Sequence, residues 1–415
     1  MIKVGARSSL LSQRQIEEVF AEIKVPYRTY LVECTGDVDQ TTSLRTLDKT
    51  DFFTDKIDKM LLQGHCRIGV HSAKDLPDPI PKGLKIVAIT QGIDPGDSLV
   101  LREFETLHSL KPGSVIATSS SRREDAVRQL RMDLNFRDLR GTIHKRLELL
   151  ENGEADGIVI AEAALLRLNL AHLNRIRLPG PTAPLQGQLA IVAREDDQEM
   201  DFLFRQLDSR TMPKALYLGP EYPLKAFRKR QIVHYPIIEI IPLNCEIGNW
   251  ESYTHLIFTS KTAVKMLASL LRRLRISPFA IGDKKVIAIG KATASIARAF
   301  GADPLIAEEE TAEGVVSLIN SINDAHFFWP HAAKARPVIK EALLHAPLST
   351  CILYDSVPLN LSLPHLSDFK EILFSSPSTV SAFFTLVKEP PTHLQFIPIG
   401  PITKETLTKY ISIKN

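Results

Sequence analysis

The segment R-I-G-V-H-S-A-K-D-L-P-D-P-I-P-K-G, residues 67–83, places a short strand directly before two charged residues and a proline-rich loop. The β-branched and apolar residues of 68–71 predict a buried strand, and the prolines and glycine that follow predict its end. Lys74 and Asp75 stand where the strand stops. Two interpretations of Asp75 remain open at this point, a catalytic acid or a structural carboxylate that caps a helix or pairs with Lys74.

Strands and helices alternate on both sides of this segment, which predicts an α/β fold with mostly parallel sheets. Helix 12–23 has one apolar stripe of Ile16, Val19, Phe20 and Ile23. The strands predicted in the first half are 2–6, 27–32, 68–71, 84–89, 114–118, 135–139 and 157–161.

A second alternation starts near residue 214, after a charged segment, 194–213, that we interpret as a helix and a domain boundary. Its predicted strands are 214–218, 233–242, 255–259, 285–289, 326–330, 351–355, 371–375 and 395–400. Two local patterns occur twice: 256–267 resembles 372–384, and 286–297 resembles 396–407. In each, hydroxyl residues or glycine join a strand to a helix, so we expect two lobes of similar design that favour anions at helix N-termini.

Composition narrows the class of protein. A chain of 415 residues, 44% hydrophobic and 24% charged, predicts two to four globular domains. We expect a cytoplasmic protein without membrane partners, since the sequence shows neither a long apolar run nor a signal peptide. The net charge of +3 argues against nucleic acid. The four cysteines are far apart and lack metal-ligand spacing, so neither a disulfide framework nor a metal site is expected.

Arginine recurs at three predicted strand-to-helix junctions, 5–10, 117–125 and 139–147, each time beside serine, threonine or glycine. Hydroxyls are ordinary N-caps, but a cation at a helix N-terminus is mildly unfavourable. The pattern therefore favours a cleft for several carboxylates or phosphates over scattered surface charges, although both interpretations remain open. Dinucleotide, P-loop and nucleophile-elbow motifs are missing.

Residues 1 to about 200 resemble porphobilinogen deaminase, also called hydroxymethylbilane synthase. The resemblance rests on A-R-S-S-L, V-H-S-A-K-D-L-P, P-K-G-L, A-T-S-S-S-R-R, L-R-G-T-I-H-K-R-L, D-G-I-V-I-A, A-L-L-R-L-N-L and L-Q-G-Q-L-A-I-V-A-R, in family order. It implies a two-lobed, periplasmic-binding-protein-like deaminase module, with lobe 1 at 1–93 plus 186–212 and lobe 2 at 94–185.

For the site, the resemblance implies that Asp75 is the catalytic carboxylate, stabilising the cation that forms when porphobilinogen loses ammonia. The side chains and glycine that it implies for binding the acetate and propionate groups are Arg7, Ser9, Lys74, Thr118, Ser119, Ser120, Arg122, Arg123, Arg140, Gly141, Arg146, Arg167 and Gln186.

The family holds a dipyrromethane cofactor through a thioether to a cysteine in a G-G-C-type loop of a third domain. Here the resemblance stops near residue 212, and that domain does not follow it. Cys34 and Cys66 stand at other positions, so the attachment site cannot be identified. The family's G-Q-G segment is Q-G-Q at 186–188, and K-T-D-F-F at 49–53 replaces a glycine-rich turn.

Residues 214–415 resemble uroporphyrinogen-III synthase, through I-F-T-S-K-T-A-V, A-I-G-K-A-T-A, T-A-E-G-V, F-F-W-P-H, L-Y-D-S, F-S-S-P-S-T-V and I-G-P-I-T in order. The resemblance implies a two-lobed α/β synthase module, with lobe 1 at 214–244 plus 362–415 and lobe 2 at 245–361. It implies that Tyr354 is catalytic and helps a hydroxyl leave. The substrate-binding hydroxyls that it implies are those of Thr259, Ser260, Thr293, Thr311, Ser375, Ser376, Ser378 and Thr403.

The resulting prediction is a fusion of two consecutive enzymes of tetrapyrrole (haem) biosynthesis. A transferase condenses four porphobilinogen molecules to hydroxymethylbilane, and a lyase closes that chain, with ring inversion, to uroporphyrinogen III. We expect a monomer whose partners are pyrrole and tetrapyrrole substrates. The alternative is a deaminase-like module that only binds porphobilinogen or an oligopyrrole, with the synthase half alone active.

Overall fold

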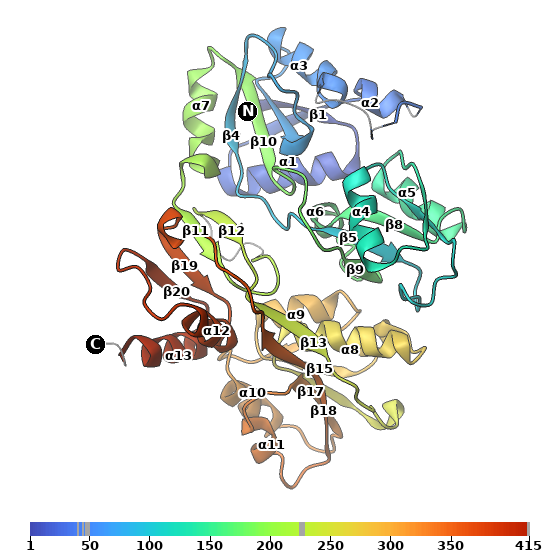
Figure 1. Cartoon of the computed structure of the whole chain (residues 1–415), viewed down its shortest axis with the longest axis vertical. Coiled ribbons are helices and arrows are strands. Elements are labelled where there is room, and N and C mark those ends of the chain that lie inside the picture. Colours follow the sequence, from blue (N-terminus) through green and yellow to red (C-terminus); the bar gives the residue numbers. More distant parts are fainter. Residues whose placement is uncertain (40, 44, 46–49, 224–228, 413–415) are drawn as a thin grey trace. The chain divides into compact units, whose positions relative to one another are not determined.

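The computed structural model describes residues 1–39, 41–43, 45, 50–223 and 229–412 (Figure 1). The chain divides into two compact units. The first unit contains Met1–Tyr235, His365–Leu373 and Pro390–Ile397, and the second contains Pro236–Pro364, Phe374–Glu389 and Pro398–Asn415. None of the helices in the described part of the chain combines the length and apolar character needed to cross a membrane.

Sheet A lies in the first unit and has the strand order β2-β1-β3-β10-β4. Its strands are β1 (Ile2–Arg7), β2 (Tyr27–Val32), β3 (Ile68–Ser72), β4 (Leu84–Ile89) and β10 (Leu189–Arg194). Helices α1 (Leu10–Ile23) and α7 (Gln198–Phe204) pack on one face, and α3 (Asp55–Leu62) packs on the other. The carboxyl ends of β1 and β3 therefore carry Arg7 and, just beyond β3, Lys74 and Asp75 to one edge of the sheet.

Sheet B, also in the first unit, has the order β7-β6-β8-β5-β9. Its strands are β5 (Asp97–Leu101), β6 (Val115–Ala117), β7 (Asn135–Arg137), β8 (Gly157–Ala161) and β9 (Arg175–Arg177). Helix α4 (Ser121–Leu130) covers one face, and α5 (Ile143–Glu151) and α6 (Glu162–Arg167) cover the other. The chain leaves sheet A after β4, builds sheet B, and returns as β10 between β3 and β4 (Figure 1).

The last sheet of the first unit, sheet C, has the order β12-β11-β19-β20. It consists of β11 (Lys214–Tyr217), β12 (Gln231–His234), β19 (Glu371–Phe374) and β20 (Gln395–Pro398). The residues that end β19 and β20, Phe374 and Pro398, belong to the second unit.

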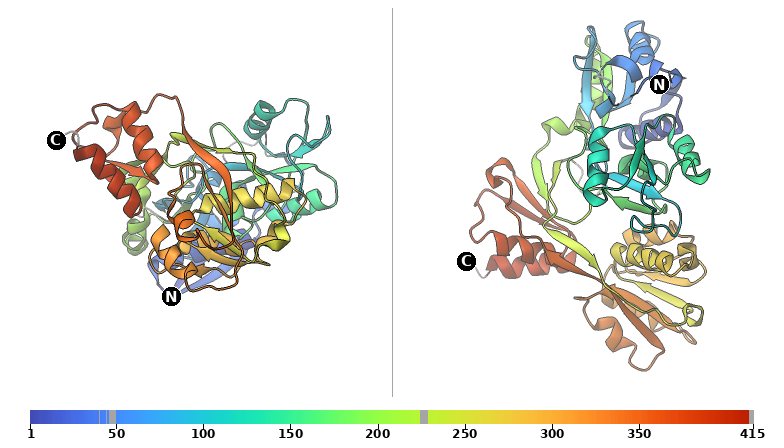
Figure 2. Two further views of the ribbon diagram at one scale, coloured as in Figure 1. Left: turned by 90° about the horizontal axis from the view of Figure 1, so that it is seen from below. Right: turned by 45° about the vertical axis from the view of Figure 1, so that its right-hand side comes forward.

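Sheet D forms the centre of the second unit, in the order β13-β18-β17-β14-β15-β16. Its strands are β13 (Ile238–Pro242), β14 (His255–Phe258), β15 (Lys285–Ala288), β16 (Leu305–Ile306), β17 (Phe327–Ala332) and β18 (Leu348–Pro358). Helices α8 (Lys261–Arg273) and α9 (Lys291–Arg298) cover one face, and α10 (Ala312–Ile319) and α11 (Val338–Ala342) cover the other (Figure 2). Helices α12 (Pro377–Leu386) and α13 (Pro401–Ser412) pack on each other.

Short helices complete the described structure. They are α2 (Thr35–Val38), η1 (Asp51–Phe53), η2 (Ala73–Asp75), η3 (Arg205–Leu207), η4 (Ser209–Thr211), η5 (Trp250–Ser252), η6 (Pro278–Ile281) and η7 (Leu366–Asp368).

The α/β class is confirmed, but sheets A and B are more mixed than expected. Strand β10 is antiparallel to both β3 and β4, and β5 is antiparallel to β8 and β9. The predicted strand 233–242 is two strands, because residues 235–237 interrupt it and the two parts join different sheets. The predicted helix 194–213 is shorter, since Arg194 ends β10 and α7 covers only 198–204.

A disulfide joins Cys245 to Cys351, so the expectation that the cysteines form none is wrong. The sequence separates these cysteines by 106 residues, but antiparallel pairing of β13 with β18 brings the two segments together and their Cα atoms lie 6.1 Å apart. Long-range pairing of this kind is not visible in cysteine spacing. The predicted lobe boundaries stay a prediction, because a division of the chain into two units does not test the boundaries between four lobes.

Candidate active site

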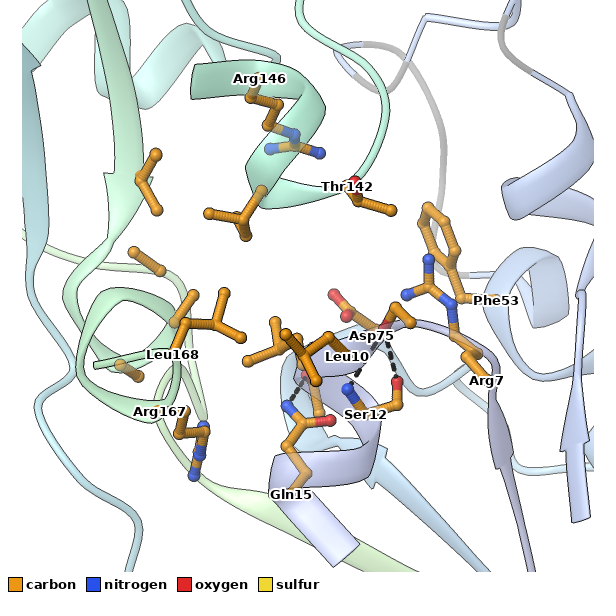
Figure 3. Close-up of a pocket in the computed structure, with 18 of the residues that line it drawn as sticks. Arg7, Leu10, Ser12, Gln15, Phe53, Asp75, Thr142, Arg146, Arg167 and Leu168 are labelled. Carbon is orange, nitrogen blue, oxygen red and sulfur yellow. Dashed lines mark hydrogen bonds between the residues drawn. The ribbon is translucent and has the colours of Figure 1, made fainter. Parts of the chain in front are cut away.

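A cavity of about 510 Å³ in the first unit contains most of the predicted deaminase residues (Figure 3). Its walls come from both sheets: the β1–α1 junction and η2 belong to sheet A, while α5 and α6 belong to sheet B. The predicted residues that line it are Arg7, Ser9, Lys74, Asp75, Ser119, Arg123, Arg140, Gly141, Arg146, Arg167 and Gln186. Thr118, Ser120 and Arg122 are not among its lining residues.

Asp75 is half-buried, and Figure 3 shows its carboxylate pointing into the open middle of the cavity. No residue in the described ranges forms a hydrogen bond or ion pair with this carboxylate, and Asp75 ends the short helix η2 instead of capping a following helix. The structural alternatives considered for Asp75, a cap or a pair with Lys74, are therefore not what the structure shows. The carboxylate is left available for a ligand.

Three of the predicted cations that line the cavity also form no ion pair with a described carboxylate: Lys74, Arg146 and Arg140. Lys74 donates a hydrogen bond to Gln186 Oε1 at 3.1 Å, and burial, followed by the charge of Arg123, lowers the Lys74 pKa to about 8. Arg146 donates to the Gly141 carbonyl at 2.8 Å, and burial together with neighbouring arginines lowers its pKa to about 10. In Figure 3 its guanidinium points from α5 into the cavity.

Arg140 reaches from the sheet B side to the backbone of the sheet A side. It donates to the carbonyl of Gly36 at 3.1 Å and to that of Asp39, and it lies over the ring of Phe52. Its Nε and Nη1 are buried without a hydrogen-bond partner, and burial lowers the pKa of Arg140. Buried donors without acceptors are costly, so Arg140 is positioned to bind an anion.

Arg7 and Arg167 line the cavity but are already paired. Arg7 binds the Asp37 carboxylate through Nε at 3.0 Å and through Nη2, and lies over the Phe53 ring at 4.6 Å. Arg167 donates to Glu18 at 2.9 and 3.2 Å and to the Gly187 carbonyl at 2.8 Å. Accordingly, the Arg167 guanidinium points away from the middle of the cavity in Figure 3.

Asp97, at the start of β5, holds the other two predicted arginines. Its carboxylate accepts from Arg122 at 2.8 Å and from Arg123 at 2.9 and 2.6 Å. Burial opposes its ionisation, but Arg123 and Arg122 outweigh burial and lower the Asp97 pKa. Arg122 also donates to the Pro181 carbonyl at 2.7 Å, which explains why it does not line the cavity.

Gln186 connects the two sides of the site. Its Oε1 accepts from Lys74, which follows β3 of sheet A, and its Nε2 donates to the Pro95 carbonyl at 2.6 Å and to Asp97 at 3.0 Å. Gln186 thus links Lys74, on the sheet A side, to Asp97 and its two arginine partners on the sheet B side.

The hydroxyl residues and the glycine at the three junctions have different roles in the structure. Ser9 is the N-cap of α1, where it accepts from the Ser12 amide at 3.2 Å, so the ordinary role of N-cap applies to it. Gly141 has φ +92°, a conformation that favours glycine, and exposes its carbonyl to Arg146. Thr118 is fully buried and its hydroxyl has no partner, while Ser120 precedes α4 without a side-chain cap.

Sequence reasoning missed Asp97, Asp37 and Phe53. Phe53 follows the K-T-D segment that had been recognised only as a departure from the family pattern, and it lines the cavity. Asp97 begins D-S-L-V-L, a strand that was not predicted; an acid opening an otherwise apolar run is the signal that was available. In the described part of the chain, no cluster of His, Cys, Asp and Glu side chains is positioned to hold a metal ion.

In the second unit, Tyr354 and Ser260 form a hydroxyl pair. Tyr354 Oη lies 2.8 Å from Ser260 Oγ, and Ser260 also N-caps α8 by accepting from Ala263 at 3.0 Å. Burial raises the pKa of Tyr354. Thr259, beside Ser260 at the end of β14, accepts from Trp329 Nε1 at 3.5 Å.

The remaining predicted hydroxyls of the second unit follow strands or begin helices. Thr311 and Ser376 are the N-caps of α10 and α12. Thr293 and Thr403 are buried within α9 and α13, and Ser378 lies half-buried in α12. Ser375 has a buried hydroxyl without a partner, so it is the member of this group that most clearly lacks a structural role.

Comparisons with known proteins match each half of the chain to a different family. Residues 2–201 match the family model described as porphobilinogen deaminase, dipyromethane cofactor binding domain, and residues 227–411 match that of uroporphyrinogen-III synthase HemD. A probable porphobilinogen deaminase of Chlamydia pneumoniae is 36% identical over 208 residues, which are 49% of this chain and 88% of that protein.

Two further matches serve as examples, one for each half of the chain. A porphobilinogen deaminase of Caldicellulosiruptor saccharolyticus is 38% identical over 198 residues, 46% of this chain and 67% of that protein. A crystal structure of uroporphyrinogen-III synthetase from Helicobacter pylori has a TM-score of 0.36 and 17% identity, covering 49% of this chain and 89% of its own.

Proposed function

The chain belongs to the porphobilinogen deaminase family through residues 2–201 and carries a uroporphyrinogen-III synthase domain at 227–411, and on this basis we propose how its residues act. The two domains indicate tetrapyrrole biosynthesis: formation of hydroxymethylbilane from porphobilinogen, and its conversion to uroporphyrinogen III. A deaminase half that only binds pyrroles is not favoured.

In the first unit, we propose that Asp75 is the catalytic residue of deamination. When porphobilinogen loses ammonia, its aminomethyl carbon and ring become a cationic azafulvene. The Asp75 carboxylate is fixed at the cavity and forms no hydrogen bond or ion pair with another described side chain. It can therefore stabilise this cation without first breaking another interaction. The α-carbon of the next pyrrole then attacks the methylene carbon, and this α-carbon loses its proton as its own ring regains aromaticity.

Lys74, Arg140 and Arg146 bind the acetate and propionate groups. This assignment rests on the lack of an ion-pair partner, the same observation that distinguishes Asp75. None of the three cations forms an ion pair with a described carboxylate. Arg7, Arg123 and Arg167 are paired, so they shape the cavity and its potential and contribute less direct binding. Arginine forms two parallel hydrogen bonds with a carboxylate, which orients the ring as well as attracting it.

The test is Asp75→Asn, which preserves volume and removes the charge. We expect porphobilinogen consumption to fall at least about 100-fold, the usual effect of removing a preorganised electrostatic group. Cyclisation of supplied hydroxymethylbilane should be unchanged. Asp78→Asn is the matched control, since Asp78 is exposed three residues further on. Equal loss of both activities in Asp75→Asn would contradict separate sites.

In the second unit, we propose that the Tyr354–Ser260 pair contacts the hydroxyl of hydroxymethylbilane as it leaves. Ser260 is fixed by capping α8, and its contact with Tyr354 Oη sets the position of the phenol. No other strong acid or base is required, because the substrate ionises readily and the domain mainly has to control its conformation. Ser375, with its unpartnered buried hydroxyl, is a candidate contact for a substrate carboxylate.

Joining the two domains raises the concentration of the synthase around newly made hydroxymethylbilane. That benefit is specific to this pair of reactions, since the linear intermediate otherwise closes spontaneously to the wrong isomer. A monomeric, cytoplasmic protein without nucleic-acid or membrane partners stays part of this proposal.

A further inference from the structure

The family model that matches residues 2–201 is named for a dipyrromethane cofactor, which the resemblance expects to be held by a thioether. A thioether needs a cysteine whose sulfur reaches the cavity. The chain contains four cysteines, and none of them lines it. The residues present therefore do not fit covalent attachment, and the surroundings of each thiol explain why.

Cys34 and Cys66 are fully buried in the core on the α3 face of sheet A. Cys66 packs under β1, where a Cβ added to Gly5 would lie 2.9 Å from its sulfur. Burial raises the pKa of Cys34 to about 12 and that of Cys66 to about 11. The thiolate is the nucleophilic form, so both thiols are inaccessible and chemically unprepared to attack an azafulvene.

Cys245 and Cys351 lie in the second unit and are bonded to each other. A sulfur in a disulfide has no thiol with which to form a thioether. Cys351 is, in addition, only 2% exposed within the core of sheet D. Neither cysteine can substitute for the missing attachment site.

The charges around the cavity offer a different means of holding the same molecule. Four cationic side chains that line it, Lys74, Arg140, Lys145 and Arg146, form no ion pair with any carboxylate in the described ranges. A dipyrrole with an acetate and a propionate on each ring carries four carboxylates. Its charge thus matches the unpaired cations, and Asp75 remains free for the pyrrole nitrogens.

We propose that this chain holds its oligopyrrole primer by ion pairs alone, as an exchangeable ligand that is not bonded to any side chain. The proposal rests on the deaminase function proposed above. Of the two lysines that line the cavity, Lys74 and Lys145, Lys74 is the one adjacent to Asp75 in the sequence and is the nearest alternative nucleophile along the chain. Its amine would form an aminomethyl bond like that of porphobilinogen, in which the amine is the group that departs, so the bond would not be a lasting anchor.

The experiment combines two measurements on the full chain. First, the chain is incubated with porphobilinogen and its mass is measured after denaturation; we expect the mass of the unmodified polypeptide. Second, binding is measured for an unreactive dipyrromethane that carries the same four carboxylates. We expect binding at low salt that is lost at 1 M salt, where the Debye length is about 3 Å, and lost in Lys74→Gln and Arg146→Gln.

Every outcome decides the proposal. An added mass of whole pyrrole units that survives denaturation, on any residue, overturns it, and so does a failure of the dipyrromethane to bind. A Cys34→Ser, Cys66→Ser double variant should consume porphobilinogen at the wild-type rate. If that variant does not fold, the wild-type mass still decides. An unmodified chain that binds the dipyrromethane but never consumes porphobilinogen would refute the deaminase function while leaving the ion-pair binding supported.

Discussion

Asp97→Asn is expected to destabilise the first unit strongly. The Asp97 carboxylate is 2% exposed and accepts four hydrogen bonds of 2.6–3.0 Å, three from Arg122 and Arg123 and one from Gln186. Asparagine fits the same space but leaves two guanidinium groups without a counter-charge. Removing one partner of a buried ion pair costs about 3–5 kcal/mol. Arg122 is partly exposed and stays hydrated, so we expect a loss of about 3 kcal/mol.

Urea unfolding at pH 7 measures this loss, with circular dichroism reporting the whole chain. Trp250 and Trp329 are the protein's two tryptophans and both lie in the second unit, so their fluorescence is an internal reference that should not shift. Asp133→Asn is the matched control, because Asp133 pairs with Arg131 at the surface of the same half. We expect no measurable loss there.

The same variant gives a pH test with a defined sign. The Asp97 pKa is lowered in the folded state, so its contribution is present above the unfolded value of about 4 and is lost as pH falls through the folded pKa. The stability difference between wild type and Asp97→Asn should therefore shrink on acidification. A difference below about 1 kcal/mol at pH 7, or one that grows as pH falls, would refute the reasoning.

Three further outcomes are expected. KM for porphobilinogen should rise as pH increases through about 8, because Lys74 loses its charge there. The Lys74→Arg variant should move that rise to higher pH. If the rise stays at the same pH in the variant, Lys74 is not the group that causes it. Tyr354→Phe should slow cyclisation about tenfold, because the loss of one hydrogen bond of ~1.4 kcal/mol corresponds to a tenfold change in rate. It should also increase the share of the uninverted isomer. Tyr253→Phe is the control. Thiol titration of the denatured, unreduced chain should give two thiols, Cys34 and Cys66, and four would contradict the Cys245–Cys351 disulfide.

Local patterns predicted much of this structure. The strand before Lys74 and Asp75, the helix with the Ile16–Val19–Phe20 stripe and the junctions at 5–10 and 139–147 are all determined by neighbours in sequence. For that reason the prediction placed Arg7 and Asp75 at strand ends and Arg146 within the helix that follows Gly141, and the structure brings all three to one cavity.

What could not be predicted depends on contacts between distant segments. Whether an arginine is free or neutralised was decided by Asp37, Asp97 and Glu18, which lie 25–149 residues away from their partners. Asp97 at least opens an apolar run, but nothing near any of the three carboxylates in the sequence identifies its arginine partner. The Cys245–Cys351 bond depends in the same way on the pairing of β13 with β18.

The late return of β10 has a consequence for synthesis of the chain. In sheet A, β3 and β4 do not pair with each other and are joined only through β10. As the polypeptide leaves the ribosome, one edge of β3 and the strand β4 thus stay without partners while all of sheet B, residues 97–177, is added. Sheet B is built from one continuous stretch and can form during that interval, whereas the edge that carries Asp75 is completed only after residue 194 has emerged.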